Sequence, residues 1–185
     1  MYIRSRGMTL IELIVIFSII AILITTAIPA YTQFLNRQKS NGISQLIYQR
    51  FMLARNIAIS RSEAVKFCGS RDGLNCFSNS LLYLLVFEDK NRNHRIDSDE
   101  QLYQRVDLGT EEEQLHLRAA LGRHYIEIDA NGRARQTGSF YYCPKNRDPH
   151  HAQRITINLA GRAYIATDDN GDGIVEMSDG SQMVC

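Results

Sequence analysis

A long apolar run dominates the first part of the chain. From Met8 to Pro29 there are 22 residues, of which only Glu12 is charged. A helix rises about 1.5 Å per residue, so a run of this length would span the roughly 30 Å hydrocarbon core of a bilayer. The pattern therefore predicts a transmembrane helix over residues 8–30, with one carboxylate inside it.

The apolar period changes over residues 31–62, where it becomes that of an amphipathic helix. Apolar residues recur at steps of three and four, at Ile43, Leu46, Ile47, Phe51, Ala54 and Ala58. One face of this segment would therefore pack on the core of a domain. Pro29 and Gly42 are the weakest points of such a helix, because proline lacks an amide hydrogen and glycine is flexible.

Short apolar runs separated by Gly, Asn and Asp follow from residue 63 to residue 185. Eight of them predict strands, at residues 64–68, 81–88, 101–107, 114–118, 124–129, 139–143, 154–159 and 162–167. The predicted fold is α+β, with a long N-terminal helix whose second half lies across an antiparallel β-sheet. Residues 81–87 are nearly all apolar, which predicts a central strand covered on both faces.

The charges around the apolar run predict its orientation. Arg4 and Arg6 precede the run, and Glu12 is the only acidic residue before Glu63. Positive charge beside a span stays in the cytoplasm, so the N-terminus would be cytoplasmic and the later residues exported. The exported part meets an oxidising compartment, where cysteines form disulfides.

Four cysteines allow three disulfide pairings. We favour Cys68 with Cys76, because the Gly and Asn residues between them permit a tight loop, and Cys143 with Cys185. The alternative is a four-cysteine metal site. The spacing argues against it, because the two short Cys-x-x-Cys arms of a zinc site are missing.

The isolated carboxylate of Glu12 needs a partner, since an ionised group inside a bilayer costs roughly 2.5 to 3.5 kcal/mol. Cleavage between Gly7 and Met8 would create an amine one helical turn away. The basic leader ending in Gly7, followed by Met8, Glu12 and Pro29, resembles the signal of type IV pilins and type II secretion pseudopilins.

That resemblance implies several processing and assembly steps. A prepilin peptidase would remove residues 1–7 on the cytoplasmic side of the inner membrane. Met8 would then be N-methylated, and Glu12 would serve assembly of the N-terminal helices into a filament with other pilins or pseudopilins. The alternative is an ordinary signal anchor with an incidental glutamate, although such a signal would end in a small-residue cleavage site after its apolar run.

The exported part resembles the GspH/FimT group of minor pilins and pseudopilins, which also contains FimU. The resemblance lies in residues 53–65, 86–102, 131–143 and 154–162, in their order and spacing. It implies a low-abundance structural subunit that primes or caps a filament, and no enzyme. A type IV pilus and a type II secretion system both remain open, and the Cys68–Cys76 loop with the Cys185 tail looks more like the pilus subgroup.

Two acidic segments have the spacing of calcium loops. In the first, the side chains at positions 1, 3, 5, 9 and 12 are Asp89, Asn91, Asn93, Asp97 and Glu100. His94 occupies the position at which the sharp turn needs glycine, and basic residues offset the acids. We therefore favour a polar hairpin turn for this segment over a metal site.

The second acidic segment fits calcium better. Asp168, Asn170, Asp172 and Asp179 occupy positions 1, 3, 5 and 12, with Gly173 at position 6. Residues 163–185 contain no Lys or Arg, so the acids would repel one another unless a cation binds. The sequence predicts calcium bound weakly, at about 10⁻⁴ to 10⁻³ M. A solvated acidic turn is the alternative.

Residues 118–162 carry eight Lys or Arg against three acids, although the net charge of the chain is only +1. Some FimT-type pilins are DNA receptors, and a Gly-Arg-x-Arg motif near their C-terminus binds the DNA. Here the full motif lies earlier and contains Arg133 and Arg135, and the later copy keeps only Arg162. Tyr141 and Tyr142 would stack on bases or pack in the core. These residues make DNA a candidate partner, against which the acidic tail counts.

Overall fold

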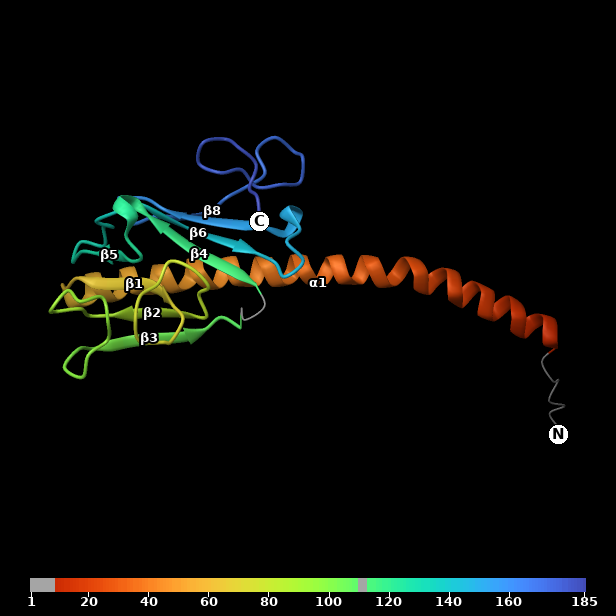
Figure 1. The fold of residues 1–185 in the computed structure, drawn as a ribbon, viewed down its shortest axis with the longest axis horizontal. Helices are drawn as coiled ribbons and strands as arrows, with labels where there is room; N and C mark the ends of the chain where they lie inside the picture. Colours follow the sequence, from red (N-terminus) through yellow and green to blue (C-terminus); the bar gives the residue numbers. More distant parts are fainter. Residues whose placement is uncertain (1–8, 110–112) are drawn as a thin grey trace. The chain divides into compact units, whose positions relative to one another are not determined.

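The computed structural model describes residues 9–109 and 113–185. It divides into two compact units, with the boundary between Gln38 and Lys39. Helix α1 (Leu10–Arg61) contributes residues to both units and contains Pro29 and Gly42 without interruption (Figure 1). Both residues were expected to be weak points of the helix, but neither breaks it.

Helix α1 ends in a turn that satisfies its last carbonyl groups. Ser62 takes a positive φ of 55°, and the amide of Glu63 donates to the carbonyl oxygen of Ala58 at 3.2 Å. This pattern, with a left-handed residue after the last turn, is a common helix stop. It turns the chain sharply into the first strand.

The second unit contains two antiparallel sheets of four strands each (Figure 1). The first has the order β3-β2-β1-β5 and consists of β1 (Val65–Ser70), β2 (Tyr83–Phe87), β3 (Leu102–Asp107) and β5 (Ile126–Ile128). The second has the order β4-β6-β7-β8 and consists of β4 (Gln114–Ala119), β6 (Gly138–Cys143), β7 (Gln153–Ile157) and β8 (Ala163–Ile165). Two 3₁₀ turns, Ala120–Gly122 and Pro149–His151, complete the elements.

The α+β prediction is confirmed, and all eight predicted strands are present, but they form two sheets where the sequence predicted one. Alternation of apolar residues shows which face of a strand is buried and does not show which strands pair. The second sheet begins at β4, which pairs with β6 and not with the preceding strand β3.

One core cluster joins the helix to both sheets. Phe51 of α1 meets Phe67 of β1 edge to face, with ring centroids 5.6 Å apart. Phe67 meets Phe140 of β6 in the same way, at 5.5 Å. All three rings are fully buried. Edge-to-face pairs add about 0.5 to 1.5 kcal/mol each to the effect of area burial, so this stack fixes the helix against both sheets.

Strand β2 is covered on both faces, as its apolar run predicts. Leu84 and Val86 belong to the main core under α1. Leu85 and Phe87 point to the opposite face, into a smaller cluster with Tyr125. Period-two alternation is absent from the sequence here because both faces of the strand are dry.

Disulfide bonds join Cys68 to Cys76 and Cys143 to Cys185. The first closes the loop after β1. The second ties the end of the chain to β6, where Met183 and Ala152 complete a small buried cluster. This is the pairing that the sequence favours.

We predict that Gly69→Ala destabilises the protein by about 1 to 3 kcal/mol through overpacking. A Cβ atom at Gly69 would lie 2.1 Å from Cδ1 of Leu81, which is itself buried. Gly42→Ala is the matched control, because a Cβ there meets nothing within 4 Å. On helix propensity it should stabilise α1 by up to about 1 kcal/mol. Thermal unfolding of the full chain in detergent measures both changes, and equal melting temperatures for the two variants would contradict the prediction.

We also predict unequal losses when the disulfides are removed. In the loop-entropy model, replacing Cys143 and Cys185 together by Ser costs about 4 kcal/mol, against about 2.6 kcal/mol for Cys68 and Cys76, because the first pair closes a longer loop. Denaturant unfolding of the two double variants gives the comparison. A larger loss from the Cys68 and Cys76 variant would show that local packing of the short loop outweighs chain entropy.

Candidate functional site

The start of α1 is fixed by a reciprocal pair of side-chain hydrogen bonds between Thr9 and Glu12. The amide and the hydroxyl of Thr9 both donate to Oε2 of Glu12, at 3.1 Å each. The amide of Glu12 donates back to the Thr9 hydroxyl at 3.3 Å. This is a capping box, which satisfies amide groups that a helix start leaves open. Glu12 is thus held at the helix terminus, while Gly7 and Met8 lie outside the described residues.

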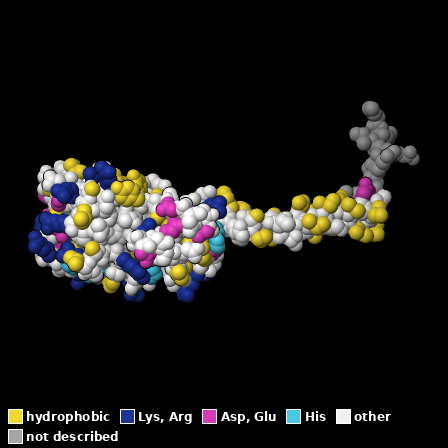
Figure 2. All heavy atoms as spheres, turned by 90° about the horizontal axis from the view of Figure 1, so that it is seen from above, with side chains coloured by type: hydrophobic (Ala, Val, Ile, Leu, Met, Phe, Trp, Pro, Cys, Tyr) yellow, Lys and Arg dark blue, Asp and Glu magenta, His cyan; other side chains and the backbone are white. Residues whose placement is uncertain are grey.

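The helix segment that follows is apolar and exposed. Within the described residues, α1 is the one helix long and apolar enough to cross a membrane, and its most apolar window has none of its residues buried. Figure 2 shows hydrophobic side chains along this segment. Its polar residues satisfy themselves, because the hydroxyl groups of Ser18, Thr25 and Thr32 each donate to a carbonyl of the preceding turn. The segment therefore presents few free polar groups to a bilayer or to neighbouring helices.

The second acidic loop is built from hydrogen bonds within itself. Asp168 accepts from the amides of Gly171 and Gly173, at 2.7 Å each. Asp172 accepts from the side chain of Gln182 at 2.6 Å. Asp179 accepts from the amide and hydroxyl of Ser181. The structure thus places the first three predicted calcium ligands, including Asn170, in one turn, with Asp179 in a separate turn.

Arg154, which lies outside this stretch of sequence, offsets part of the charge of this loop. Arg154 of β7 lines the same cleft as Glu176 and Asn170. Hydrogen bonds from Ser181 lower the pKa of Asp179, and Arg154 adds to the effect. Hydrogen bonds from Gln182 and Ile174 lower the pKa of Asp172, with a contribution from His150. Within the described residues no group of three or more His, Cys, Asp or Glu side chains is arranged for a metal ion. Calcium stays a prediction from the sequence.

The two acidic loops both have positive φ values at positions 4 and 6. In the first loop these positions are Arg92 and His94, with φ values of 63° and 64°, and the glycines at the same positions of the second loop have 81° and 86°. The predicted side chains of the first loop also meet. Asn91 and Asn93 both donate to Asp97, at 2.7 and 2.6 Å. The lack of a glycine therefore does not prevent the turn.

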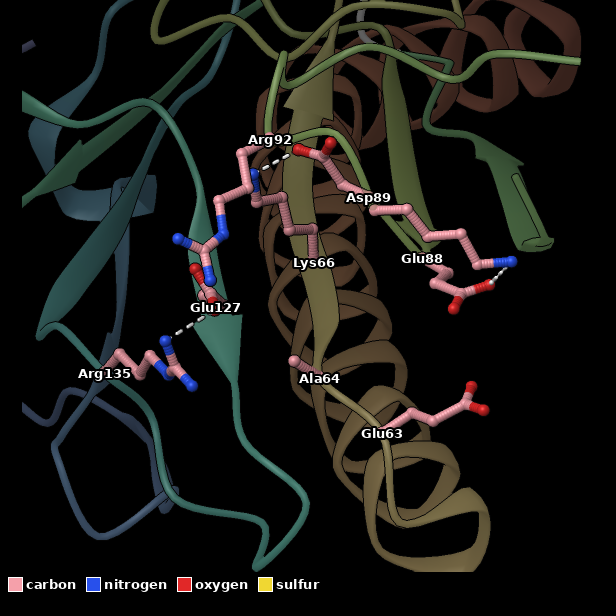
Figure 3. A pocket seen from close by; sticks show the side chains of 9 residues that line it. Glu63, Ala64, Lys66, Glu88, Asp89, Arg92, Glu127 and Arg135 are labelled. Atoms are coloured by element: carbon pink, nitrogen blue, oxygen red, sulfur yellow. Dashed lines mark hydrogen bonds and ion pairs between the residues drawn. The ribbon is translucent and has the colours of Figure 1, made fainter. Parts of the chain in front are cut away.

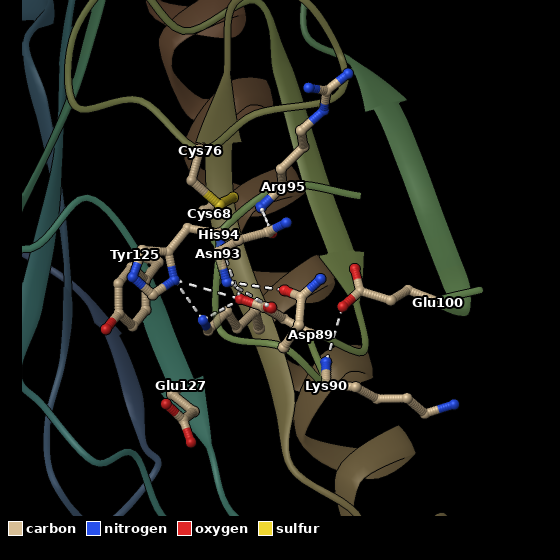
Figure 4. Close-up of polar contacts among 12 residues, drawn as sticks. Cys68, Cys76, Asp89, Lys90, Asn93, His94, Arg95, Glu100, Tyr125 and Glu127 are labelled. Atoms are coloured by element: carbon tan, nitrogen blue, oxygen red, sulfur yellow. Dashed lines mark hydrogen bonds and ion pairs between the residues drawn. A yellow bond between two sulfur atoms is a disulfide. The ribbon is translucent and has the colours of Figure 1, made fainter. Parts of the chain in front are cut away.

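The carboxylate of Asp89 in this loop is buried and forms an ion pair. Lys66 of β1 contacts Asp89, and their side chains are 4% and 0% exposed. Burial would raise the pKa of Asp89, but hydrogen bonds from Lys66 and from the His94 amide outweigh it and lower the pKa. Figure 4 shows Asp89 beside Asn93 and His94. The sequence analysis missed Lys66, since a single lysine in a strand carries no pattern.

Beside this pair lies a charged cleft of about 220 Å³ between β1, β5 and the loop after β2. Its walls carry opposite charges that pair locally. Arg135 contacts Glu127 at 3.1 Å, and Lys90 contacts Glu88 at 3.2 Å. Figure 3 shows Arg135 beside Glu127 on one side of the cleft. Arg135, one of the predicted DNA-binding residues, is therefore already paired with a carboxylate.

The two Gly-Arg turns lie against each other. A Cβ atom at Gly161 would be 1.9 Å from the carbonyl oxygen of Gly132, so the later turn requires glycine at this contact. Arg55 of α1 also donates to the Gly132 carbonyl, at 2.8 Å. Arg133 and Arg162 follow the two glycines and are exposed. The fold thus brings together arginines that are 29 positions apart in sequence.

These arginines are free of carboxylates in the part of the chain that is described, where neither Arg133 nor Arg162 forms an ion pair. Lys and Arg side chains gather at the end of the domain where α1 ends (Figure 2). Of the two predicted stacking residues, Tyr142 is fully buried in the core and Tyr141 is only partly buried. Tyr142 therefore cannot stack on a base.

Comparison with protein families matches two segments. Residues 44–161 match the family described as type II transport protein GspH, and residues 3–28 match the prokaryotic N-terminal methylation motif. No curated protein sequence matches the chain.

Solved structures show the same fold. The chain is similar to the type IV minor pilin FimU of Pseudomonas aeruginosa in two crystal forms, P21 and P65. The P21 form has a TM-score of 0.55 and 16% identity, covering 82% of this chain and 98% of that one. The P65 form has a TM-score of 0.52 and 16% identity, covering 69% and 92%. The chain is also similar to the minor pseudopilin EpsH of the Vibrio cholerae type 2 secretion system, with a TM-score of 0.47 and 18% identity. The match covers 69% of this chain and 95% of that one.

The fold, the methylation motif and the family match agree with one another. The GspH model covers more than half of the chain. The protein therefore belongs to the GspH family, as a minor pilin or pseudopilin of a type IV pilus or a type II secretion system, and it is a structural subunit and not an enzyme.

Proposed function

We propose that this protein is a minor pilin of a type IV pilus, a structural subunit that primes or caps the filament. The observation that carries the proposal is the exposed apolar segment of α1, which begins at the capped Glu12. An apolar surface of this length needs a bilayer before assembly and neighbouring helices after it. Other pilins, bound through this helix, are the expected partners.

Processing in this proposal begins with a prepilin peptidase that cuts between Gly7 and Met8, followed by N-methylation of Met8. The protein would wait in the inner membrane with its N-terminus in the cytoplasm. Glu12 would then pair with the new amine of its own or a neighbouring subunit. A pilus is preferred to a secretion pseudopilus because the short Cys68–Cys76 loop and the tail tied by Cys185 resemble the pilus subgroup.

We predict that Glu12→Gln inserts into the membrane normally and is missing from sheared surface fibres. Glutamine can still accept the Thr9 bonds of the capping box, so this variant removes the charge and keeps the helix start. Membrane fractionation and immunoblotting of sheared fibres measure the two steps. Glu63→Gln, which removes an exposed carboxylate in the other unit, is the control and should enter fibres.

Two results would contradict the proposal. If Glu12→Gln enters fibres at the level of the unchanged protein, the charge is not needed for docking. If the unchanged protein is absent from sheared fibres and remains with a secretion apparatus in the periplasm, the protein is a pseudopilin.

DNA binding is a second candidate function, and the contact between the two Gly-Arg turns favours it. Arg133 and Arg162 project from neighbouring turns without carboxylate partners, which suits a phosphate backbone. Arg135 is less suited, because Glu127 already neutralises it. The acidic loop at residues 168–179 limits the size of any such surface.

We predict that replacing Arg133 and Arg162 together by Ala weakens binding of duplex DNA. The plot of log K against log salt should also become less steep by about 2 units, one for each phosphate that is no longer neutralised. Fluorescence anisotropy at several salt concentrations gives the slope. Arg147→Ala is the control, since it removes an exposed charge outside the two turns. If the control loses as much affinity for DNA per charge removed, the effect comes from net charge alone, and there is no defined DNA site.

A further inference from the structure

The turn that follows β4 carries a leucine in a backbone conformation that favours glycine or asparagine. Leu121 and Gly122 have φ values of 63° and 68°, and ψ of Leu121 is 25°. The amide of Arg123 donates to the carbonyl oxygen of Ala120 at 3.4 Å, which closes the turn. Two central residues with positive φ are the pattern of a type I′ turn, in which Asn and Gly are the preferred residues. Leucine in the left-handed region is strained.

The side chain of Leu121 gains nothing from the fold in return for this strain. It is 88% exposed and belongs to none of the hydrophobic clusters formed by the described residues. Asparagine at this position would relieve the backbone and remove an apolar group from water. Neither the turn nor the packing therefore explains the leucine, which indicates that its side chain meets something outside this chain.

A second exposed leucine stands at the same end of the second sheet. Leu159, in the turn between β7 and β8, is 54% exposed. Ala119 at the end of β4 pairs with Gly138, and Gly138 pairs with Ile157 at the end of β7. The turns that follow β4 and β7 therefore lie at one end of this sheet (Figure 1). The hydrogen bond from Arg55 to the earlier Gly-Arg turn places the end of α1 there as well.

Arginine side chains accompany both leucines. Arg118 and Arg123 lie on either side of Leu121 in sequence, and their guanidinium groups lie over tyrosine rings, 5.5 and 5.6 Å from the centroids. Arg162 follows Leu159 by three positions. Among the described residues, none of these three arginines forms an ion pair. Their charges are thus available to an anionic partner.

The acidic residues near this end have other hydrogen-bond or ion-pair partners. Glu127 pairs with Arg135 at 3.1 Å. Asp129 accepts from the amides of Asn131 and Arg133, at 2.9 and 3.0 Å, and so folds the earlier Gly-Arg turn. The surface therefore combines two protruding leucines with an excess of cations.

We propose that this end of the second unit binds the surface of a membrane that contains anionic lipids. Leu121 and Leu159 enter the headgroup region, and Arg118, Arg123 and Arg162 pair with lipid phosphates. Apolar side chains next to arginine are the combination by which proteins bind an anionic bilayer surface. A fluid surface accepts two leucines on separate turns without matching pockets, whereas a folded protein partner would need two pockets at a fixed spacing.

A flotation experiment with separate vesicles tests the proposal. The full chain is held in nanodiscs of phosphatidylcholine, so that its transmembrane segment is already in lipid, and is mixed with fluorescent vesicles. Vesicles with about 30% phosphatidylglycerol should recover about tenfold more protein than vesicles of phosphatidylcholine alone. Equal recovery by the two kinds of vesicle, or no recovery by either, would overturn the proposal.

Variants at the two leucines locate the contact. Leu121→Asn with Leu159→Asn should lower recovery by the anionic vesicles about tenfold, because the apolar contribution is lost. Val184→Asn is the matched control, since Val184 is 87% exposed and adjoins Cys185, which is tied to the opposite end of β6. If the double leucine variant binds as well as the unchanged protein, or if the control loses as much, the proposal fails.

Two further measurements on the double leucine variant separate this surface from the other functions. Its melting temperature should be equal or higher, because Asn tolerates the left-handed backbone, and it should enter fibres and bind duplex DNA like the unchanged protein. A lower melting temperature would show that the leucines serve the fold. An equal loss of DNA binding would show general damage to the surface. Either result would overturn the lipid assignment and leave the pilin proposal standing.

Discussion

The packing of the second half of α1 against both β-sheets is the constraint on which the exported unit depends. Phe51 supplies the helix side of this packing, and Phe67 and Phe140 supply one ring from each sheet. The two sheets are separate, and among the described residues no strand of one sheet pairs with a strand of the other. The helix and the two sheets therefore share one core, in which Phe67 and Phe140 also join the sheets directly.

This constraint also explains why α1 changes character along its length. From Lys39 onward the helix gives one apolar stripe to the core and keeps a polar face, which is how a surface helix of a globular unit is built. From Leu10 to Ile28 it is mostly apolar on every side and exposed. One helix thus has two parts suited to different surroundings. In the sequence, the apolar pattern changes from continuous to periodic between them.

Much of the fold follows from the sequence, because the eight strands and the long helix have clear periodic signals. The division into two sheets does not follow from the sequence, because the pairing between β4 and β6 depends on contacts between distant segments. The bond between Cys68 and Cys76 agrees with the preference from loop chemistry, and the other two cysteines are joined as that preference implies. Processing between Gly7 and Met8 is predicted from a local sequence motif. These two residues lie outside the described structure.

The polar sites are harder to predict, for identifiable reasons. In the sequence, His94 is an obstacle to a calcium-type turn, yet its backbone adopts the required conformation, and its ring contacts Lys66 and Tyr125. The acidic tail has no basic residue of its own, although Arg154 approaches it from a strand outside that stretch of sequence. In both cases the fold supplies a partner from far along the chain, which a local interpretation of charge and turn chemistry does not include.

The capping box at the start of α1 has a consequence for the subunit before it joins a filament. Glu12 already receives two hydrogen bonds from Thr9, so its carboxylate has solvating donors without any neighbour. Under the proposed function, assembly would exchange these donors for an amine and would not create the first partner of the carboxylate. A pool of unassembled subunits would then be a resting state in the membrane, recruited when the exchange becomes favourable.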